Sequence, residues 1–383
     1  MLLPLLVLIL TSVFGYSQSK PDLSIRTGDF EFRIDSLFKH FDALETPGYA
    51  IGISIGDSTL YQKGFGIANL DYGVHIEPNS KFSIASVSKQ FTAASIALLI
   101  LDKKLSLDTP ASKFIPELAK YEHEILVKHL IYNTSGIIDY YRLPRGNGLS
   151  WITFNYFDID ECIHTSLNQD TLLFKPGDRW DYSNVNFMLL TKIVEKISEQ
   201  PFSAFIKENL FIPLGMDNTF INDDITVVVK NRVIPYNFRT EENIESYADY
   251  GVKLKREGEF IQHHRNSPHY GGSGVITTIE DLLIWSKNMV SKQFGGQEFY
   301  DLMHYTPKFN HDRHNQAFGL YQGNFNGWKI FAWDGGDWGI SSQLMRFPEQ
   351  EVAIIVLSNL GSGESFRKAN AIANILIEEG IIN

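Results

Sequence analysis

The sequence has little cysteine and no cluster of basic residues. Cys162 is the single cysteine among 383 residues, so no internal disulfide can form, and we expect this small side chain to be buried. Asp and Glu total 45 against 34 Lys and Arg, and the formal net charge is -11. Because proteins that bind nucleic acids present basic surfaces, this balance argues against a nucleic-acid partner.

Apolar runs long enough to span a membrane are also lacking. The run Met1–Val13 (MLLPLLVLILTSV) is about as long as the core of a signal peptide and too short to span a membrane comfortably. Small residues at 15 and 17 and a polar stretch at 18–22 follow it. The basic residues that usually begin a signal peptide are missing, yet we expect residues 1–17 to be a signal peptide. The mature chain would then be periplasmic or secreted, without a stable membrane span; an uncleaved N-terminal anchor is the alternative.

Metal-ligand patterns are lacking as well. His263, His264, His269, His311 and His314 lie in polar, loop-like segments without carboxylates at ligand spacing. We interpret them as solvated histidines, and we expect neither a bound metal nor another cofactor.

The residues that are present predict one domain at 18–383, since repeats, low-complexity tracts and flexible linkers are missing. Strand patterns near both ends and helical patterns between them predict an α/β chain of the α+β type. An antiparallel sheet would be built from N- and C-terminal segments, at about 45–83 and 270–383, and flanked by helices. A mainly helical region would be inserted at about 84–265. The expected helices are 30–41, 90–101, 187–197, 281–289 (opened by a capping box at 277–280) and 366–378, and the expected strands are 49–57, 60–68, 328–333, 341–347 and 352–357.

Two serine motifs compete for the role of nucleophile. Gly52-Ile-Ser-Ile-Gly56 matches Gly-x-Ser-x-Gly, the nucleophile elbow, which requires a strand, a sharp turn at the serine and then a helix. Ser54 instead lies within an alternating apolar strand that is followed by a second strand. We therefore interpret Ser54 as a residue on one face of a hairpin.

The second motif, Ser-x-x-Lys, occurs at Ser86 and Lys89. It lies between an extended segment and the helix 90–101, whose apolar residues leave no polar face and so predict an interior helix. Residues three apart lie one above the other on a helix, which lets the Lys89 amine reach the Ser86 hydroxyl. Ser83 precedes the helix and Ser88 points elsewhere. The same spacing at 17/20, 36/39 and 365/368 lacks this context.

A lysine can activate a serine only as the free amine. From a reference pKa of about 10.4, this requires a lowering of roughly 3 units, or about 4 kcal/mol. Burial at the inner end of an apolar helix supplies such shifts. On Ser86 and Lys89 alone, a solvated lysine beside a capping serine remains the better interpretation.

Tyr182-Ser-Asn184, the only Tyr-x-Asn in the chain, changes this interpretation. It follows a Pro-Gly turn and precedes the helix 187–197. With Ser-x-x-Lys opening a buried helix, Tyr-x-Asn on a loop and a third glycine-containing element on a late strand, the sequence resembles the serine β-lactamase and penicillin-binding-protein superfamily. The branch in question includes class C β-lactamases, D-Ala-D-Ala carboxypeptidases and related esterases. Further similar stretches are 133–137, 213–219 and 271–274, and the likeness runs from about residue 45 to 360.

The resemblance implies a role for each matching residue. Ser86 would be the acylated nucleophile, Lys89 its amine partner, and Tyr182 the group that passes a proton to the leaving group. Asn184 would hold Lys89 and the carbonyl side of the substrate. The backbone N–H groups of Ser86 and Gly336 would form the oxyanion hole. Whether Lys89 or Tyr182 is the working base is left open by the sequence.

The third motif departs from the superfamily pattern. Trp333-Asp334-Gly335 stands where Lys-Thr-Gly or His-x-Gly is expected. Gly335 and Gly336 keep the close approach of the strand to a substrate, but Trp333 carries no charge to pair with a substrate carboxylate. Such a charge-assisted bond contributes roughly 1.5 to 3 kcal/mol. Its loss favours a neutral acyl substrate, unless a more distant cation such as Lys329 takes over.

We therefore predict an exported serine hydrolase that works through an acyl-enzyme on Ser86 and hydrolyses an ester or amide. Its substrate would be a small-molecule or peptide-like acyl compound, with cell-wall fragments as one source. A β-lactamase, a D-Ala-D-Ala carboxypeptidase or a D-aminopeptidase is the alternative. A catalytically silent binding protein of the penicillin-binding-protein type is the alternative of another class. Aromatic residues available to line the cleft are Tyr140, Tyr141, Phe331 and Trp338.

Overall fold

The structure, a computed structural model, describes residues 27–309, 315–361 and 364–383. The expected signal peptide at 1–17, and His311 and His314, lie outside the described residues. Of the other histidines interpreted as solvated, His264 is exposed, but the interpretation is wrong for His263 and His269, which are buried. Within the described part of the chain, no helix combines the length and the apolar character needed to cross a membrane.

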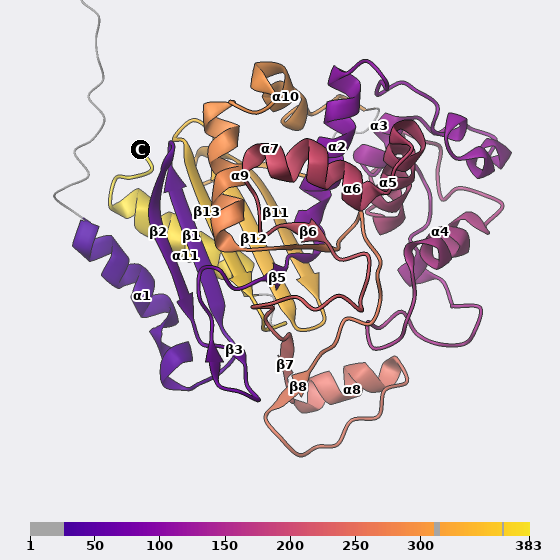
Figure 1. Ribbon diagram of the computed structural model, residues 1–383. Helices are drawn as coiled ribbons and strands as arrows, with labels where there is room; N and C mark the ends of the chain where they lie inside the picture. The colour runs from indigo at the N-terminus through magenta and orange to yellow at the C-terminus, as the bar shows by residue number, and fades with distance from the viewer. Residues whose placement is uncertain (1–26, 310–314, 362–363) are drawn as a thin grey trace, which may run out of the picture.

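Six antiparallel strands form the main sheet, in the order β10-β11-β12-β13-β1-β2. Strand β1 from the N-terminal part pairs with β13 from the C-terminal part, with Tyr49 opposite Ser358 and Ile55 opposite Val352. Segments from the two ends of the chain therefore lie side by side within one sheet (Figure 1), as predicted. The strands are β1 (Tyr49–Ile55), β2 (Ser58–Phe65), β10 (Tyr321–Phe325), β11 (Trp328–Asp337), β12 (Ile340–Phe347) and β13 (Val352–Ser358).

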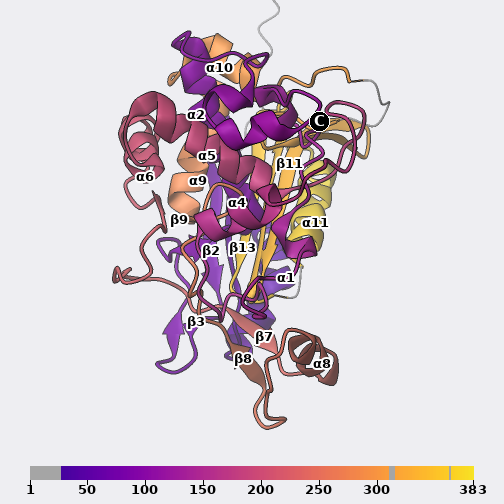
Figure 2. The ribbon, with the colours of Figure 1, turned by 90° about the vertical axis from the view of Figure 1, so that its right-hand side faces the viewer.

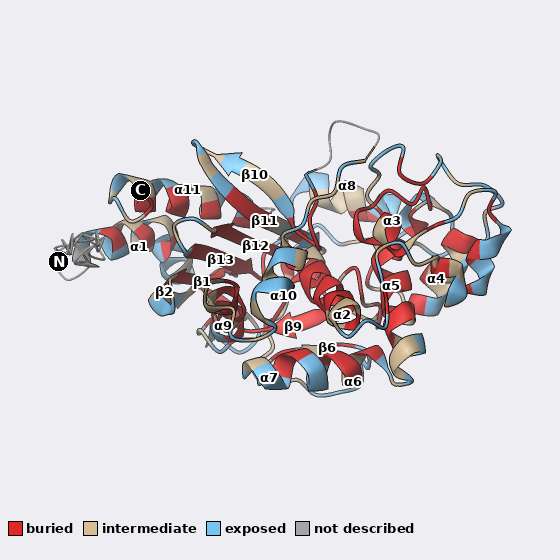
Figure 3. Ribbon diagram, turned by 90° about the horizontal axis from the view of Figure 1, so that it is seen from above, coloured by how far each residue is buried: buried red, intermediate tan, exposed pale blue. Residues whose placement is uncertain are grey.

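Helices cover both faces of this sheet. Helices α1 (Thr27–Ala43) and α11 (Ser365–Glu378) lie on one face, and α9 (Ile279–Ser291) lies on the other (Figure 3). Double coverage explains why β12 and β13 are buried along their whole length and why β13 carries mostly apolar residues. Strand β1 approaches α9 closely at Gly52, which has no side chain. A Cβ there would lie only 2.6 Å from the Ile279 side chain.

The chain between the short strands β5 (Phe82–Ser83) and β9 (Val275–Thr277) is mainly helical and packs beside the sheet (Figure 2). Its central helix α2 is buried at nearly every position, which confirms the predicted interior helix. The helices are α2 (Lys89–Leu101), α3 (Val127–Ile131), α4 (Ile159–Leu167), α5 (Asn184–Ser198), α6 (Phe202–Ile206), α7 (Ile212–Leu214) and α8 (Glu241–Asp249), with α10 (Gly296–Met303) following α9. The remaining strands are β3 (Ile67–Asn69), β4 (Val74–His75), β6 (Phe220–Ile221), β7 (Tyr236–Phe238) and β8 (Phe260–Gln262).

The predicted elements are confirmed, with shifts at their ends, except that the strand predicted at 60–68 is divided into β2 and β3, which belong to different sheets. Helix α9 begins two residues earlier than predicted, and Thr278 caps it by accepting a hydrogen bond from the Asp281 N–H at 3.2 Å. The capping box at 277–280 was therefore placed one residue too early. Strand β11 continues to Asp337, past the predicted end at 333.

Two single residues have the environments that we expected. Ser54 is 1% exposed inside the β1–β2 hairpin, so it is not the serine of a nucleophile elbow. Cys162 is buried.

Candidate active site

Ser86 lies in a short 3₁₀ helix, η2 (Ala85–Ser88), that leads directly into α2. Ala85 has a φ of 44°, a left-handed conformation that costs a non-glycine residue energy and is often found at functional turns. Ser83 lies in β5, which pairs with β9, and the Ser88 hydroxyl accepts a hydrogen bond from the Val275 N–H at 3.1 Å. Among these three serines, Ser86 is the one that lines a cavity.

Lys89 is completely buried in the first turn of α2 and is surrounded by oxygen atoms. Its Nζ lies 2.9 Å from Asn184 Oδ1, 2.6 Å from the Gly272 carbonyl oxygen and 3.2 Å from Ser86 Oγ. Amide and carbonyl oxygens can only accept hydrogen bonds. A neutral amine would therefore donate its two N–H groups to Asn184 and Gly272, and its lone pair would face the Ser86 hydroxyl.

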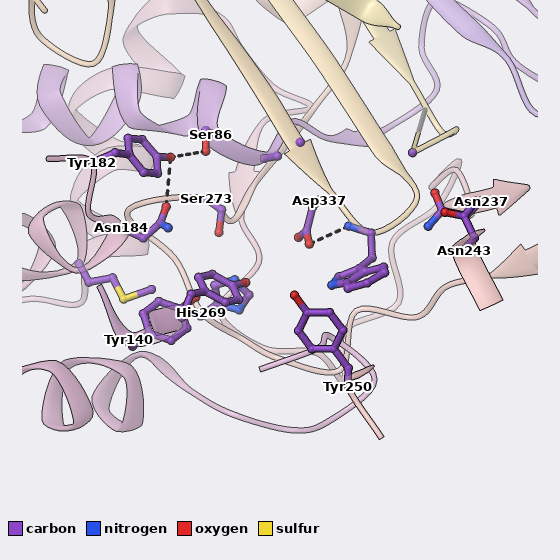
Figure 4. A pocket seen from close by; sticks show the side chains of 16 residues that line it. Ser86, Tyr140, Tyr182, Asn184, Asn237, Asn243, Tyr250, His269, Ser273 and Asp337 are labelled. Atoms are coloured by element: carbon purple, nitrogen blue, oxygen red, sulfur yellow. Dashed lines mark hydrogen bonds between the residues drawn. The ribbon is translucent and has the colours of Figure 1, made fainter. Parts of the chain in front are cut away.

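The protonation states suit this arrangement. Burial lowers the pKa of Lys89 from 10.5 to about 7, although the nearby carboxylates of Asp139 and Asp334 act in the opposite direction. Burial raises the pKa of Tyr182 above its ordinary value, so its phenol is neutral at physiological pH. The Tyr182 hydroxyl lies 2.7 Å from Ser86 Oγ and donates to Asn184 Oδ1 at 3.2 Å (Figure 4).

Asn184 is the first residue of α5, and this position puts its side chain between Lys89 and Tyr182. Its backbone N–H donates to the carboxylate of Asp139, which also accepts from the Tyr141 N–H at 3.0 Å. Asp139 is buried, and burial raises the pKa of its carboxyl group. The carboxylate thus fixes the start of α5 and adds a negative charge near Lys89.

Sequence reasoning missed two groups of this site, the Asp139 carboxylate and the Gly272 carbonyl. Both lie in or near the stretches 133–137 and 271–274, which the sequence showed only as similar to the superfamily. Asn133, in the first stretch, also holds the Tyr-x-Asn loop, because its side-chain oxygen accepts from the backbone N–H of Ser183 at 3.3 Å. No local pattern in the sequence indicates these contacts across the chain.

The end of strand β11 passes against η2 without room for a side chain at Gly335. A Cβ there would lie 2.4 Å from Ser342 Oγ, 2.5 Å from the Ile84 carbonyl oxygen and 3.0 Å from the Ser86 nitrogen. A Cβ on Gly336 would meet nothing within 4 Å. Gly336 is exposed and lines both cavities beside Ser86.

The contact at Gly335 predicts a large effect of one added methyl group. In Gly335→Ala, the strand must move away from η2, which displaces the backbone around Ser86. We expect ester hydrolysis to fall by about 10²- to 10³-fold, as when an oxyanion donor is lost. The melting temperature should also fall, and Gly336→Ala is the matched control that should keep the wild-type melting temperature. A Gly335→Ala protein with wild-type kcat/KM would contradict this account of the contact.

Two cavities meet at Ser86, Tyr182 and Gly336, with volumes of about 440 and 910 Å³. The smaller one is lined by three of the four aromatic residues expected in the cleft, Tyr140, Tyr141 and Trp338. The larger one is lined by Trp180, Trp333, Tyr321 and Phe325, among others. Phe331 does not line either cavity; it is buried, and the Lys329 ammonium lies 5.1 Å from its ring centroid.

The charged side chains that line these cavities are acidic. Asp337 lines the smaller cavity (Figure 4) and Asp334 the larger one, whereas no Lys or Arg of the described residues lines either of them. Arg265 lies behind Asp337, with 3.9 Å between the charged groups. Trp333 lies near Tyr182, with ring centroids 6.3 Å apart and planes at 22°. In the described ranges, no group of three or more His, Cys, Asp or Glu residues is placed to bind a metal ion.

The chain is similar in sequence to several known proteins. The family profile described as Beta-lactamase matches residues 34–378. Penicillin-binding protein 4* of Bacillus subtilis is 26% identical over 327 residues, which is 82% of this chain and 68% of that protein. A D-aminopeptidase of Gluconobacter oxydans is 22% identical over 331 residues, 86% of this chain and 59% of that protein. The chain thus spans only part of the length of these curated relatives.

Solved structures show the same fold. The octameric penicillin-binding protein homologue from Pyrococcus abyssi superposes with a TM-score of 0.75 at 23% identity, over 91% of this chain and 77% of that one. The D-amino acid amidase from Ochrobactrum anthropi SV3 gives a TM-score of 0.74 at 19% identity, over 91% of this chain and 99% of that one.

Proposed function

The chain belongs to the β-lactamase family, whose members include serine hydrolases, and on this basis we propose that it hydrolyses an ester or amide through an acyl-enzyme on Ser86. The observation that carries the proposal is the position of Lys89. Its amine is buried, has a pKa lowered to about 7, and lies 3.2 Å from the Ser86 hydroxyl. A lysine in this state is half deprotonated near neutral pH and can accept the serine proton.

In the proposed mechanism, Ser86 Oγ attacks the substrate carbonyl carbon while its proton moves to the Lys89 amine. The negative charge that develops on the carbonyl oxygen is stabilised by the N–H groups of Ser86 and Gly336. The neutral Tyr182 hydroxyl donates a proton to the leaving group and is reprotonated through Lys89. A water molecule, activated by the same groups, then releases the acyl group from Ser86.

The charges of the cleft support a neutral acyl substrate. β-Lactams and D-Ala-terminated peptides carry a carboxylate, which would lie close to Asp334 and Asp337. The guanidinium of Arg265 lies beside Asp337, at 3.9 Å, and is already paired with that carboxylate. Trp333 offers one indole N–H in place of the missing charge. We therefore place ester or amide hydrolysis ahead of the β-lactamase and carboxypeptidase alternatives. A panel of p-nitrophenyl esters, nitrocefin and D-amino-acid peptides tests this order, and faster turnover of nitrocefin than of every ester would reverse it.

Restoring a cation at position 333 should change the substrate preference. In Trp333→Lys, an ammonium group can pair with a substrate carboxylate, and we expect kcat/KM for nitrocefin to rise by about 10-fold. Trp333→Met is the control, because it removes the ring without adding a charge. An equal gain in both variants would show that the ring only blocks access, and a gain in neither would contradict the charge argument.

Export remains part of the proposal. The leader at 1–17 predicts a periplasmic or secreted enzyme, and the mass of the mature protein recovered from the native host tests it. A protein that retains Met1–Val13 would favour the uncleaved anchor instead.

A further inference from the structure

A second charged site lies away from the cleft, around Arg346 of strand β12. Arg346 is 4% exposed, and one of its terminal nitrogens donates to Gln90 Oε1 at 2.7 Å. Its Nε and its other terminal nitrogen, Nη1, are buried and have no hydrogen-bond partner among the protein groups that the structure describes. The indole of Trp285 lies beside the guanidinium, 5.7 Å from ring to charge.

No acidic side chain in the described part of the chain pairs with this charge. Among the residues that the structure describes, none of the acidic side chains lies within 4.0 Å of Arg346. Glu351 lines the same small cavity but is exposed and extends toward Gly56. His304 is neutral, because burial and the nearby Arg346 lower its pKa to about 3. Burial also lowers the pKa of Arg346, to about 9, so the guanidinium is still protonated at neutral pH.

The space beside the guanidinium is small and offers hydrogen-bond donors. The cavity measures about 20 Å³ and lies between α9, α10 and the β12–β13 turn. Such a volume holds one occupant of about the size of a water molecule, which excludes sulfate, phosphate or a carboxylate ligand. The hydroxyl of Ser286, which also lines the cavity, is buried and has no hydrogen-bond partner in the described protein.

We propose that Arg346 Nε, Arg346 Nη1 and the Ser286 hydroxyl form a binding site for a single monatomic anion, of which chloride is the common example. A guanidinium has donors and no acceptor, so its occupant must accept hydrogen bonds. Water can accept them but leaves the charge uncompensated, and a buried charge without a counter-charge is costly. A halide supplies both the acceptor and the charge.

The site is joined to the catalytic helix through one residue. Gln90 accepts from Arg346 and from the indole N–H of Trp285 at 3.3 Å, and it follows Lys89 in α2. Anion binding would hold Gln90 and the first turn of α2 in place. This inference stands whether or not the chain is a hydrolase.

Thermal unfolding at constant ionic strength tests the site, with sodium chloride replacing sodium gluconate. At chloride 100-fold above its Kd, we expect the wild-type melting temperature to rise by about 3 to 4 °C. Arg346→Met should abolish this chloride dependence, whereas Arg367→Met, which removes an exposed arginine of α11, should retain it. Equal chloride effects in wild type and Arg346→Met would overturn the proposal.

Bromide soaking keeps the test independent of how well Arg346→Met folds. In wild-type crystals soaked in sodium bromide, we expect an anomalous peak within hydrogen-bonding distance of Arg346 Nε and the Ser286 hydroxyl. Ordinary water density there, without anomalous signal at high bromide, would show that water fills the cavity and would overturn the proposal. The same holds if the Glu351 carboxylate occupies the site.

Discussion

Ser86→Ala is expected to lose covalent labelling by a fluorophosphonate probe and about 10⁴- to 10⁶-fold of its ester hydrolysis. The hydroxyl is the atom that would be acylated, and the structure places it 3.2 Å from the Lys89 amine and 2.7 Å from the Tyr182 hydroxyl. Neither of the two neighbouring serines can replace it, because Ser88 is turned toward β9 and Ser83 is held in β5. Stopped assays with intact-mass analysis measure both effects.

The matched control for this variant is Ser83→Ala. It removes a hydroxyl three residues away that contacts Arg265 and not Lys89, so labelling at Ser86 should be retained. Ser86→Ala would contradict the mechanism if it kept a tenth or more of wild-type turnover. The silent binding protein would be favoured by a different pattern, in which the wild type turns over no ester, amide or β-lactam and Ser86→Ala binds ligands with unchanged affinity.

Lys89→Met is expected to lower the rate of acylation by about 10²- to 10⁴-fold, the usual contribution of a general base. Methionine fills a similar volume but cannot accept the Ser86 proton. Substrate affinity should change less than the acylation rate, because Lys89 is buried beneath Ser86. Single-turnover kinetics separate the two quantities, and circular dichroism checks that the variant is folded. A loss confined to KM would show that Lys89 only shapes the pocket.

The same lysine determines the pH dependence. Only its free amine accepts a proton, so the acylation rate should rise as pH increases through about 7, the pKa of Lys89, and this limb should be absent in Lys89→Met.

The contribution of Lys89 to stability should also rise with pH. The pKa of Lys89 is lower in the folded chain than its ordinary value of 10.5, so the unfolded chain binds more protons between these pH values. Lys89 therefore makes the free energy of unfolding rise from about pH 7 to 10.5.

Much of the fold could be predicted because the spacing of apolar residues and the order of the helices and strands can be read directly from the sequence. Apolar alternation identified β1, and the apolar run at 96–101 identified the interior helix α2. Strands at both ends of the chain predicted one sheet shared by the two ends, and the structure shows that β1 and β13 pair within it. The start of α9 was misplaced by two residues, because Thr277 and Thr278 are equally good caps by residue type and only the structure shows which one accepts the Asp281 N–H.

The candidate site was predictable only where its residues share a helix or a motif. Ser86 and Lys89 are three residues apart, so helical geometry alone brings them together. The Gly272 carbonyl reaches Lys89 from 183 residues away, and the Asp139 carboxylate meets the start of α5 across 45 residues. Such contacts depend on tertiary packing, and backbone groups leave no trace in residue type. The acidic character of the cleft was also missed, because Asp337 lies beyond the predicted end of β11 and only the structure places it beside the cavity.

Peptide mapping after reaction with a fluorophosphonate tests the central claim most directly. Trypsin should release Phe82–Lys89 (FSIASVSK), which contains Ser83, Ser86 and Ser88 together, and fragmentation of this peptide locates the adduct. We predict a single adduct on Ser86, formed faster above pH 7 than below it, and no adduct in Ser86→Ala. An adduct on Ser83 or Ser88, or an unmodified peptide under conditions that label a control esterase, would contradict the proposed acyl-enzyme.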